Sequence, residues 1–195
     1  MNLEAAWNTY VRLPLPWVRT LDGAYWASQQ IGDNHGPEKY EKLQPESYVM
    51  LNTIVKLASR QLMLLEVGCM GGRHLRALRR RGYRYAYGLD VRPCLDRKIM
   101  VGSFEARLPK IMDRLYTVVF TMGMTVELIP PSFPICHHLA RIANRAVVLV
   151  VQEHGVPYPR LYQQEFQREG FACMRYQTPI TPSSGASLFV FERQP

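Results

Sequence analysis

The 195-residue sequence has only four cysteines, and no two of them form a CxxC pair. A structural zinc site needs a cluster of ligands, and a disulfide scaffold needs denser cysteine, so we expect reduced thiols and no metal. No apolar stretch approaches the roughly 18 residues that a membrane span requires. The beginning of the chain also lacks the basic and then apolar pattern of a signal peptide. These absences predict a cytoplasmic protein that does not cross a membrane.

Acidic residues are scarce beside basic ones, 16 against 24, which leaves a net charge of +8. A basic balance raises the question of nucleic acid. Only one group of basic residues is concentrated, on and just after a single predicted helix: Arg73, Arg76, Arg79, Arg80, Arg81 and Arg84. A solvated outer helix face explains this group at least as well as an RNA groove does. Nucleic acid is therefore a possible partner that the sequence does not favour.

What the chain does have is enough length and apolar content for one compact domain with a large core. Residues 1–58 contain all three tryptophans and several proline and glycine breaks, and they end in a predicted helix over 46–59. We interpret 1–58 as an N-terminal helical and aromatic lid. Residues 59–195 are then the main domain.

From residue 62 onward, short apolar runs alternate with helical patterns. The pattern predicts strands at 62–67, 85–90, 99–102, 117–121 and 146–151, helices at 72–81, 133–143 and 161–169, and a short helix or turn at 103–112. This alternation predicts an α/β fold with a doubly wound, mostly parallel sheet. The final strands, 171–177 and 187–192, are joined by a plain loop, which favours an antiparallel C-terminal hairpin.

A glycine-rich turn, Gly68 to Gly72, follows the first predicted strand, and the second strand ends at Asp90. Ligands of doubly wound sheets bind at the carboxyl ends of strands, where the strand order switches. Glycine lets the main chain approach a ligand closely, and a carboxylate at the end of the second strand can accept hydrogen bonds from ribose hydroxyls. The layout indicates a nucleoside-binding β-α-β unit.

The glycine spacing narrows the choice of nucleoside. The dinucleotide pattern G-x-G-x-x-G fails, because its third position is Met70 and its sixth is Arg73, and no G-K-[ST] follows as in a P-loop. Instead Glu66-x-Gly68-x-x-x-Gly72 resembles the first motif of class I S-adenosylmethionine-dependent methyltransferases, usually E/D-x-G-x-G-x-G. One departure is Met70, which stands where the middle glycine is common.

Other segments strengthen this resemblance, among them 64–69, 72–75 and 88–90. Residues 101–109 resemble the segment after the third strand of that family, and 113–131 resemble its fourth strand and the following loop. The resemblance implies a Rossmann-like methyltransferase sheet that binds S-adenosyl-L-methionine. It assigns Glu66 and Gly68 to the methionine end of the cofactor, Gly72 to the turn into the first helix, Asp90 to the ribose, Ser103 and Phe104 to the adenine, and Thr121 and Met122 to the wall near the sulfonium. Core packing is the alternative for Phe104 and Met122.

A general base is needed only where the acceptor must lose a proton. We identify three candidates. His154 directly follows the strand that ends near 151, and Glu127 lies after the fourth strand, where many relatives carry a histidine. His35 lies in a loop of the N-terminal segment that could fold over the site with the lid.

The sequence therefore predicts an S-adenosylmethionine-dependent methyltransferase that acts on an oxygen or nitrogen of a small-molecule acceptor. The loop around 121–131 and the last strands resemble enzymes of secondary metabolism and sugar modification. An RNA or protein methyltransferase is the first alternative, for which the charge argues. A non-catalytic binding module is the second, suggested by Met70 and by the lack of an obvious base. The sequence does not predict the oligomeric state.

Overall fold

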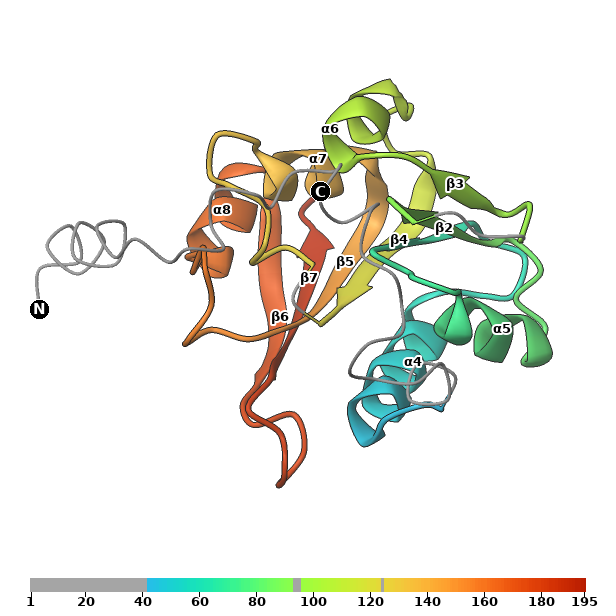
Figure 1. Ribbon diagram of the computed structural model, residues 1–195, viewed down its shortest axis with the longest axis horizontal. Helices are drawn as coiled ribbons and strands as arrows, with labels where there is room; N and C mark the ends of the chain where they lie inside the picture. The colour runs from blue at the N-terminus through green and yellow to red at the C-terminus, as the bar shows by residue number, and fades with distance from the viewer. Residues whose placement is uncertain (1–41, 93–95, 124) are drawn as a thin grey trace, which may run out of the picture.

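A seven-stranded sheet forms the centre of the protein, which a computed structural model describes for residues 42–92, 96–123 and 125–195 (Figure 1). The strand order is β3-β2-β1-β4-β5-β7-β6. The strands are β1 (Leu64–Val67), β2 (Ala86–Asp90), β3 (Ile99–Val101), β4 (Tyr116–Met122), β5 (Ala143–Val151), β6 (Phe171–Gln177) and β7 (Ser187–Arg193). Strands β1 to β5 pair in parallel, whereas β7 runs antiparallel to both β5 and β6. The expected doubly wound sheet with an antiparallel C-terminal hairpin is confirmed.

Helices connect most of the parallel strands, as this topology requires: α5 (Arg73–Arg80) follows β1, α6 (Phe104–Arg107) and the 3-10 helix η2 (Leu108–Lys110) follow β3, and α7 (Ile135–Ile142) follows β4. Helix α4 (Pro45–Leu57) precedes β1, and α8 (Tyr162–Arg168) leads from β5 to the C-terminal hairpin. Proline at the first position of α4 is already set to the helical φ and lacks only an N–H that would have no helical partner. Helix α5 begins directly after Gly72, which is in the left-handed region with φ 75°.

The alternation of side chains along each strand divides the core between the two faces of the sheet. In β5, Val148 and Val150 belong to the cluster under α4 and α5, whereas Val147 and Leu149 belong to the cluster under α7 and α8. Both faces are covered by helices (Figure 1). This double covering explains why β5 is an almost continuous apolar run.

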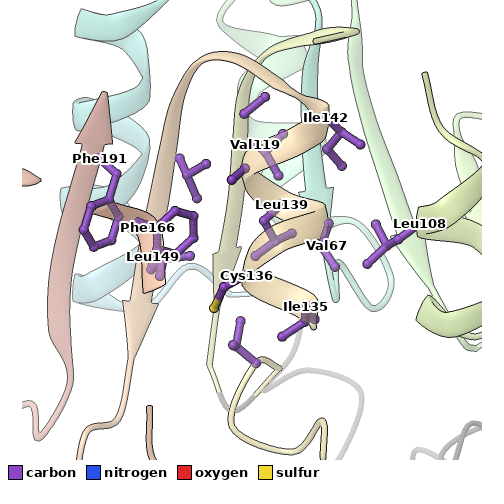
Figure 2. Packing of buried hydrophobic residues seen from close by; sticks show 14 of the residues in the cluster. Val67, Leu108, Val119, Ile135, Cys136, Leu139, Ile142, Leu149, Phe166 and Phe191 are labelled. Atoms are coloured by element: carbon purple, nitrogen blue, oxygen red, sulfur yellow. The ribbon is translucent and has the colours of Figure 1, made fainter. Parts of the chain in front are cut away.

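Helix α7 shows how one face is sealed. Its buried Ile135, Leu139 and Ile142 face the sheet, where Val119 and Leu149 lie (Figure 2). Each fully buried aliphatic side chain of this kind stabilises the fold by about 1.5–3 kcal/mol. The helix therefore anchors the parallel strands whose carboxyl ends carry the candidate site.

The expected elements are all present, with small shifts in their bounds. The largest shift is in β5, which begins at Ala143 rather than near 146, because Asn144 and Arg145 are exposed and interrupt the apolar pattern. Helix α4 buries Met50, Leu51, Ile54 and Leu57 in the core and contacts β5 and α5. Residues 1–41 lie outside the described residues, so the lid at 1–58 stays a prediction. Within the described ranges, no helix has both the length and the apolar character that crossing a membrane requires.

Candidate functional site

The carboxyl ends of β1 and β4 lie side by side where the strand order reverses, which is the place where sheets of this kind bind ligands. Gly68 follows β1 with φ 76°. A Cβ placed on Gly68 would lie 2.2 Å from the Thr125 Oγ1 atom and 2.9 Å from its Cβ. The glycine turn and the loop after β4 therefore approach one another more closely than any side chain at this position allows.

Backbone hydrogen bonds connect the glycine turn to the end of β2. The N–H of Gly68 donates to the Leu89 carbonyl at 2.8 Å, and the N–H of Gly72 donates to the Cys69 carbonyl at 2.8 Å. Gly71 has no described atom within 4 Å of the position that its Cβ would take. The turn thus combines a well-anchored backbone with an open outer side, an arrangement in which a ligand can lie against the main chain.

Met70 is the departure from the methyltransferase motif, and its backbone has a conformation that glycine adopts more readily. Its φ is 49°, in the left-handed region that glycine adopts without a steric penalty. Its N–H donates to the Asp90 Oδ2 atom at 2.6 Å. The turn therefore keeps a glycine-like path although a large side chain stands there.

We expect Met70→Gly to raise the free energy of unfolding by up to about 1 kcal/mol, because the left-handed strain is removed and only part of the gain is offset by the freer unfolded chain. Met70→Ala is the matched control, since it removes the side chain but keeps the strained backbone. Urea unfolding of both variants measures the difference. Equal stability of the glycine and alanine variants would show that the backbone at this position is not strained.

Asp90 ends β2 and is 5% exposed. Its Oδ2 atom accepts from the N–H of Met70, and its Oδ1 atom accepts from the N–H of Arg92 at 2.9 Å. A carboxylate has about four acceptor positions, so each oxygen can accept one further hydrogen bond. The two backbone donors fix the orientation of the carboxylate and leave capacity for two hydroxyl groups of a ligand.

Glu66 lies on β1, on the same face of the sheet as Asp90 and Met122 by the alternation of the strands. It is 1% exposed, and its Oε1 atom is 2.5 Å from the Nδ1 atom of His74. The Nε2 atom of His74 lies 2.9 Å from the Ser47 hydroxyl oxygen. The roles of His74 and Ser47 beside Glu66 were not predicted from the sequence. The position of His74 could have indicated its contact with Glu66, because the first turn of the helix after the glycine turn lies beside the end of β1.

The residues assigned to the adenine and to the sulfonium wall have different surroundings. Ser103 caps α6 and accepts from the N–H of Ala106 at 3.3 Å, and Phe104 is buried in the core beside α7. The Thr121 side chain is fully buried, and its hydroxyl oxygen has no hydrogen-bond partner among the described residues. Met122 is half-buried against α4. The cofactor roles of these four residues stay predictions.

Glu127 is fully buried in the loop after β4, and its Oε1 atom accepts from the N–H of Gln152 at 2.6 Å. Burial raises the pKa of this carboxyl to about 7, and the Gln152 hydrogen bond and the Arg160 guanidinium only partly oppose the effect. The other oxygen of Glu127 has no hydrogen-bond partner within the described residues, and neither has the buried Tyr162 hydroxyl. Glu127 therefore connects the loops after β4 and β5.

His154 is exposed in the loop after β5, on the same edge of the sheet as the glycine turn. Its neighbour Glu153 has a structural role, because it accepts hydrogen bonds from the Ser187 and Tyr176 hydroxyls. It thereby fixes the loop end of the C-terminal hairpin. His35 lies outside the described residues. Within the described ranges, no three histidine, cysteine or acidic side chains are grouped to hold a metal ion.

Solved structures share this arrangement of strands and helices. No family model matches the sequence, and no curated protein matches it either. Magnesium protoporphyrin IX methyltransferase from Synechocystis, solved with bound SAM, matches with a TM-score of 0.66 over 88% of this chain and 94% of its own, at 15% identity. The chain has the fold of class I S-adenosylmethionine-dependent methyltransferases.

Two further matches show how widely this methyltransferase fold is used. A 1,6-didemethyltoxoflavin-N1-methyltransferase from Burkholderia thailandensis, with its substrate and S-adenosylhomocysteine bound, matches with a TM-score of 0.57 at 11% identity and covers 78% of each chain. The [4+2]-cyclase SpnF matches with a TM-score of 0.56 at 10% identity, over 74% of this chain and 79% of its own. The fold by itself therefore does not specify the reaction.

The residues at the strand ends fit the cofactor of this methyltransferase fold. Asp90 has unused acceptor positions, and the buried Glu66 carboxylate has one oxygen without a hydrogen-bond partner among the described residues. Gly71 and Gly123 leave their surroundings open within the described part of the chain. The Asp90 and Glu66 carboxylates thus offer acceptor oxygens for hydroxyl and ammonium groups near a turn that a ligand can approach.

Proposed function

We propose that this protein is an S-adenosylmethionine-dependent methyltransferase that methylates an oxygen or nitrogen of a small molecule. The observation that carries the proposal is the Asp90 carboxylate, which two backbone N–H groups hold at the end of β2 beside the glycine turn. In a nucleoside site on a doubly wound sheet, this position receives the ribose hydroxyls. The bound substrates of structurally similar methyltransferases support a small-molecule acceptor.

The chain would bind the two ends of the cofactor with separate groups. Asp90 accepts from the ribose hydroxyls, and Glu66 and Gly68 hold the methionine end. Ser103 and Phe104 contact the adenine, and Thr121 and Met122 lie beside the sulfonium. When bound, the cofactor would supply a methyl group to the nucleophilic oxygen or nitrogen of the acceptor, with S-adenosylhomocysteine as the leaving group. Alignment of the two reactants would provide much of the catalysis.

Where the acceptor carries a proton, we propose that His154 receives it. His154 is the exposed one of the two described candidates, whereas Glu127 is fully buried with one oxygen bound to the Gln152 backbone. We therefore assign Glu127 to holding the two loops together. His35 remains a third candidate for the base.

The main alternative is an RNA methyltransferase, for which the net charge of +8 argues. Several arginines on and just after α5 are engaged within the protein: Arg76 donates to the Gly71 carbonyl, Arg79 to Asp96 and the Ala86 carbonyl, and Arg81 to Asn52. These contacts give the cluster a structural use that needs no nucleic acid. RNA binding that weakens steeply with salt would nevertheless favour the alternative.

Calorimetric titration with S-adenosylhomocysteine tests the proposal. We expect wild type to bind, and Asp90→Ala to lower the affinity about 100-fold, because two hydrogen bonds to a charged acceptor are lost. Asp113→Ala is the control, since Asp113 is exposed and pairs with Arg141 away from the strand ends. Absence of binding to wild type would contradict the cofactor, and unchanged affinity in Asp90→Ala would contradict its ribose role.

A further inference from the structure

Three buried polar side chains from three different elements form a hydrogen-bonded chain beneath the glycine turn. Ser47 comes from α4, His74 from α5 and Glu66 from β1, and their exposed fractions are 0%, 3% and 1%. Ser47 and His74 are 2.9 Å apart, and His74 and Glu66 are 2.5 Å apart. The helices that carry Ser47 and His74 lie on the same side of the sheet (Figure 1). We call these residues the Ser47–His74–Glu66 chain.

The chemistry of the three groups sets the direction of the hydrogen bonds. An ionised carboxylate can only accept, so His74 Nδ1–H donates to Glu66 Oε1. In the tautomer whose Nδ1 atom carries the proton, the Nε2 atom accepts from the Ser47 hydroxyl. Ser47 Oγ in turn accepts from the N–H of Gln44 at 3.3 Å, and the Met122 sulfur lies 3.5 Å from it. The Ser47 hydroxyl, both ring nitrogens of His74 and Glu66 Oε1 therefore each have a partner.

The chain ends on an oxygen without a partner. Glu66 Oε2 is buried and makes no hydrogen bond with any described residue. Buried polar atoms in native proteins nearly always have a partner, and a carboxylate oxygen needs one more than a neutral group does. A ligand group that carries several N–H donors and a positive charge meets this need. The α-ammonium of an amino acid is such a group, and the proposed cofactor has one at its methionine end.

We propose that Ser47 and His74 are positioning residues that hold Glu66 so that its Oε2 atom receives the ammonium group of the cofactor. This inference rests on the proposed function, because it concerns how that cofactor is bound. His74 fixes the Glu66 carboxylate through Oε1, and Ser47 fixes the ring of His74. Helix α4, which lies outside the β-α-β unit that contains the glycine turn, thereby takes part in the orientation of the ligand.

Two probes separate this role from a general structural one. S-adenosylhomocysteine carries the amino acid group, whereas 5′-methylthioadenosine has the same adenosine and sulfur without it. We expect Glu66→Gln, which keeps the shape but replaces an acceptor oxygen with a donor, to lower S-adenosylhomocysteine affinity about 100-fold. We expect Ser47→Ala and His74→Phe to lower it about tenfold. Affinity for methylthioadenosine should change less than about twofold in all three variants.

Two further variants act as controls in the same titrations. His74→Asn places an amide donor near the position of Nδ1–H, and we expect it to recover most of the affinity that His74→Phe loses. His138→Phe replaces a half-buried histidine of α7 on the opposite face, and both affinities should stay at the wild-type level. Circular dichroism melting curves show whether each variant is folded.

Different results overturn the inference in different ways. If Ser47→Ala and His74→Phe weaken both probes equally, or neither, the two residues have no positioning role. If wild type binds both probes with the same affinity, Glu66 does not receive the ammonium, while the proposed cofactor stands. If wild type binds neither probe, the proposed function fails, and this inference fails with it.

Discussion

Gly68→Ala is expected to lower the free energy of unfolding by about 3 kcal/mol, the sum of a left-handed backbone that alanine resists and an overpacked contact. The added methyl group would lie 2.2 Å from Thr125 Oγ1, 2.6 Å from its Cγ2 and 2.9 Å from its Cβ. The threonine side chain is branched at Cβ, so no rotation relieves all three contacts. The loop after β4 must move away from the glycine turn. Urea unfolding at neutral pH measures the loss.

The double variant Gly68→Ala/Thr125→Gly separates the two causes. Removal of the Thr125 side chain eliminates the overpacked contact, so the cycle should return about 2 kcal/mol of coupling energy and leave only the backbone term. Thr125→Gly alone supplies the reference. Additive effects of the two substitutions would show that the glycine turn and the loop after β4 are not in contact.

Glu127→Gln is expected to change how stability depends on pH. Burial raises the pKa of Glu127 to about 7, from the ordinary value of 4.5. Between pH 4.5 and about 7, the Glu127 carboxyl is therefore protonated in the native state and ionised in the unfolded state. This contribution to stability is fully present below pH 4.5, is lost as the pH rises through about 7, and stays lost above it. The loss amounts to about 3 kcal/mol, on the order of 1.4 kcal/mol for each unit of the shift.

Glutamine is neutral at every pH and keeps an oxygen that can accept from the Gln152 N–H. The stability of Glu127→Gln relative to wild type should therefore rise by about 3 kcal/mol between pH 4.5 and pH 8 in urea unfolding. Glu105→Gln makes the same change on an exposed residue of α6, and its difference from wild type should stay flat. A flat difference for Glu127→Gln as well would mean that the Glu127 carboxyl is not titrated near neutral pH.

The elements were predictable from the sequence because their signals are local. Glycine and proline breaks separate runs of apolar residues, and the period of each run distinguishes strand from helix. The start of β5 was predicted three residues late for the same reason, because exposed Asn144 and Arg145 interrupt the local apolar run. The glycine spacing after β1 indicated a methyltransferase cofactor, although Met70 departs from the motif.

The surroundings of the candidate site were not predictable in the same way. Glu127 follows the fourth strand, as a base for the acceptor would, but its surroundings include Cys136 of α7, Tyr162 of α8 and the Gln152 N–H after β5. Ser47 reads as an ordinary residue of the first turn of a helix. Its contact with His74 exists only because α4 and α5 pack on the same face of the sheet.

The sequence by itself determined an α/β chain with a glycine turn after its first strand and a carboxylate at the end of its second. The period of the apolar residues, the spacing of the glycines and the position of a charged residue depend only on neighbouring residues, so they can be identified from the sequence. The tertiary structure alone decided the strand order, the contact of Gly68 with Thr125, the burial of Glu127 and the Ser47–His74–Glu66 chain. Each of these joins distant segments, and packing them together removes water from polar groups, which then need partners that no local pattern specifies.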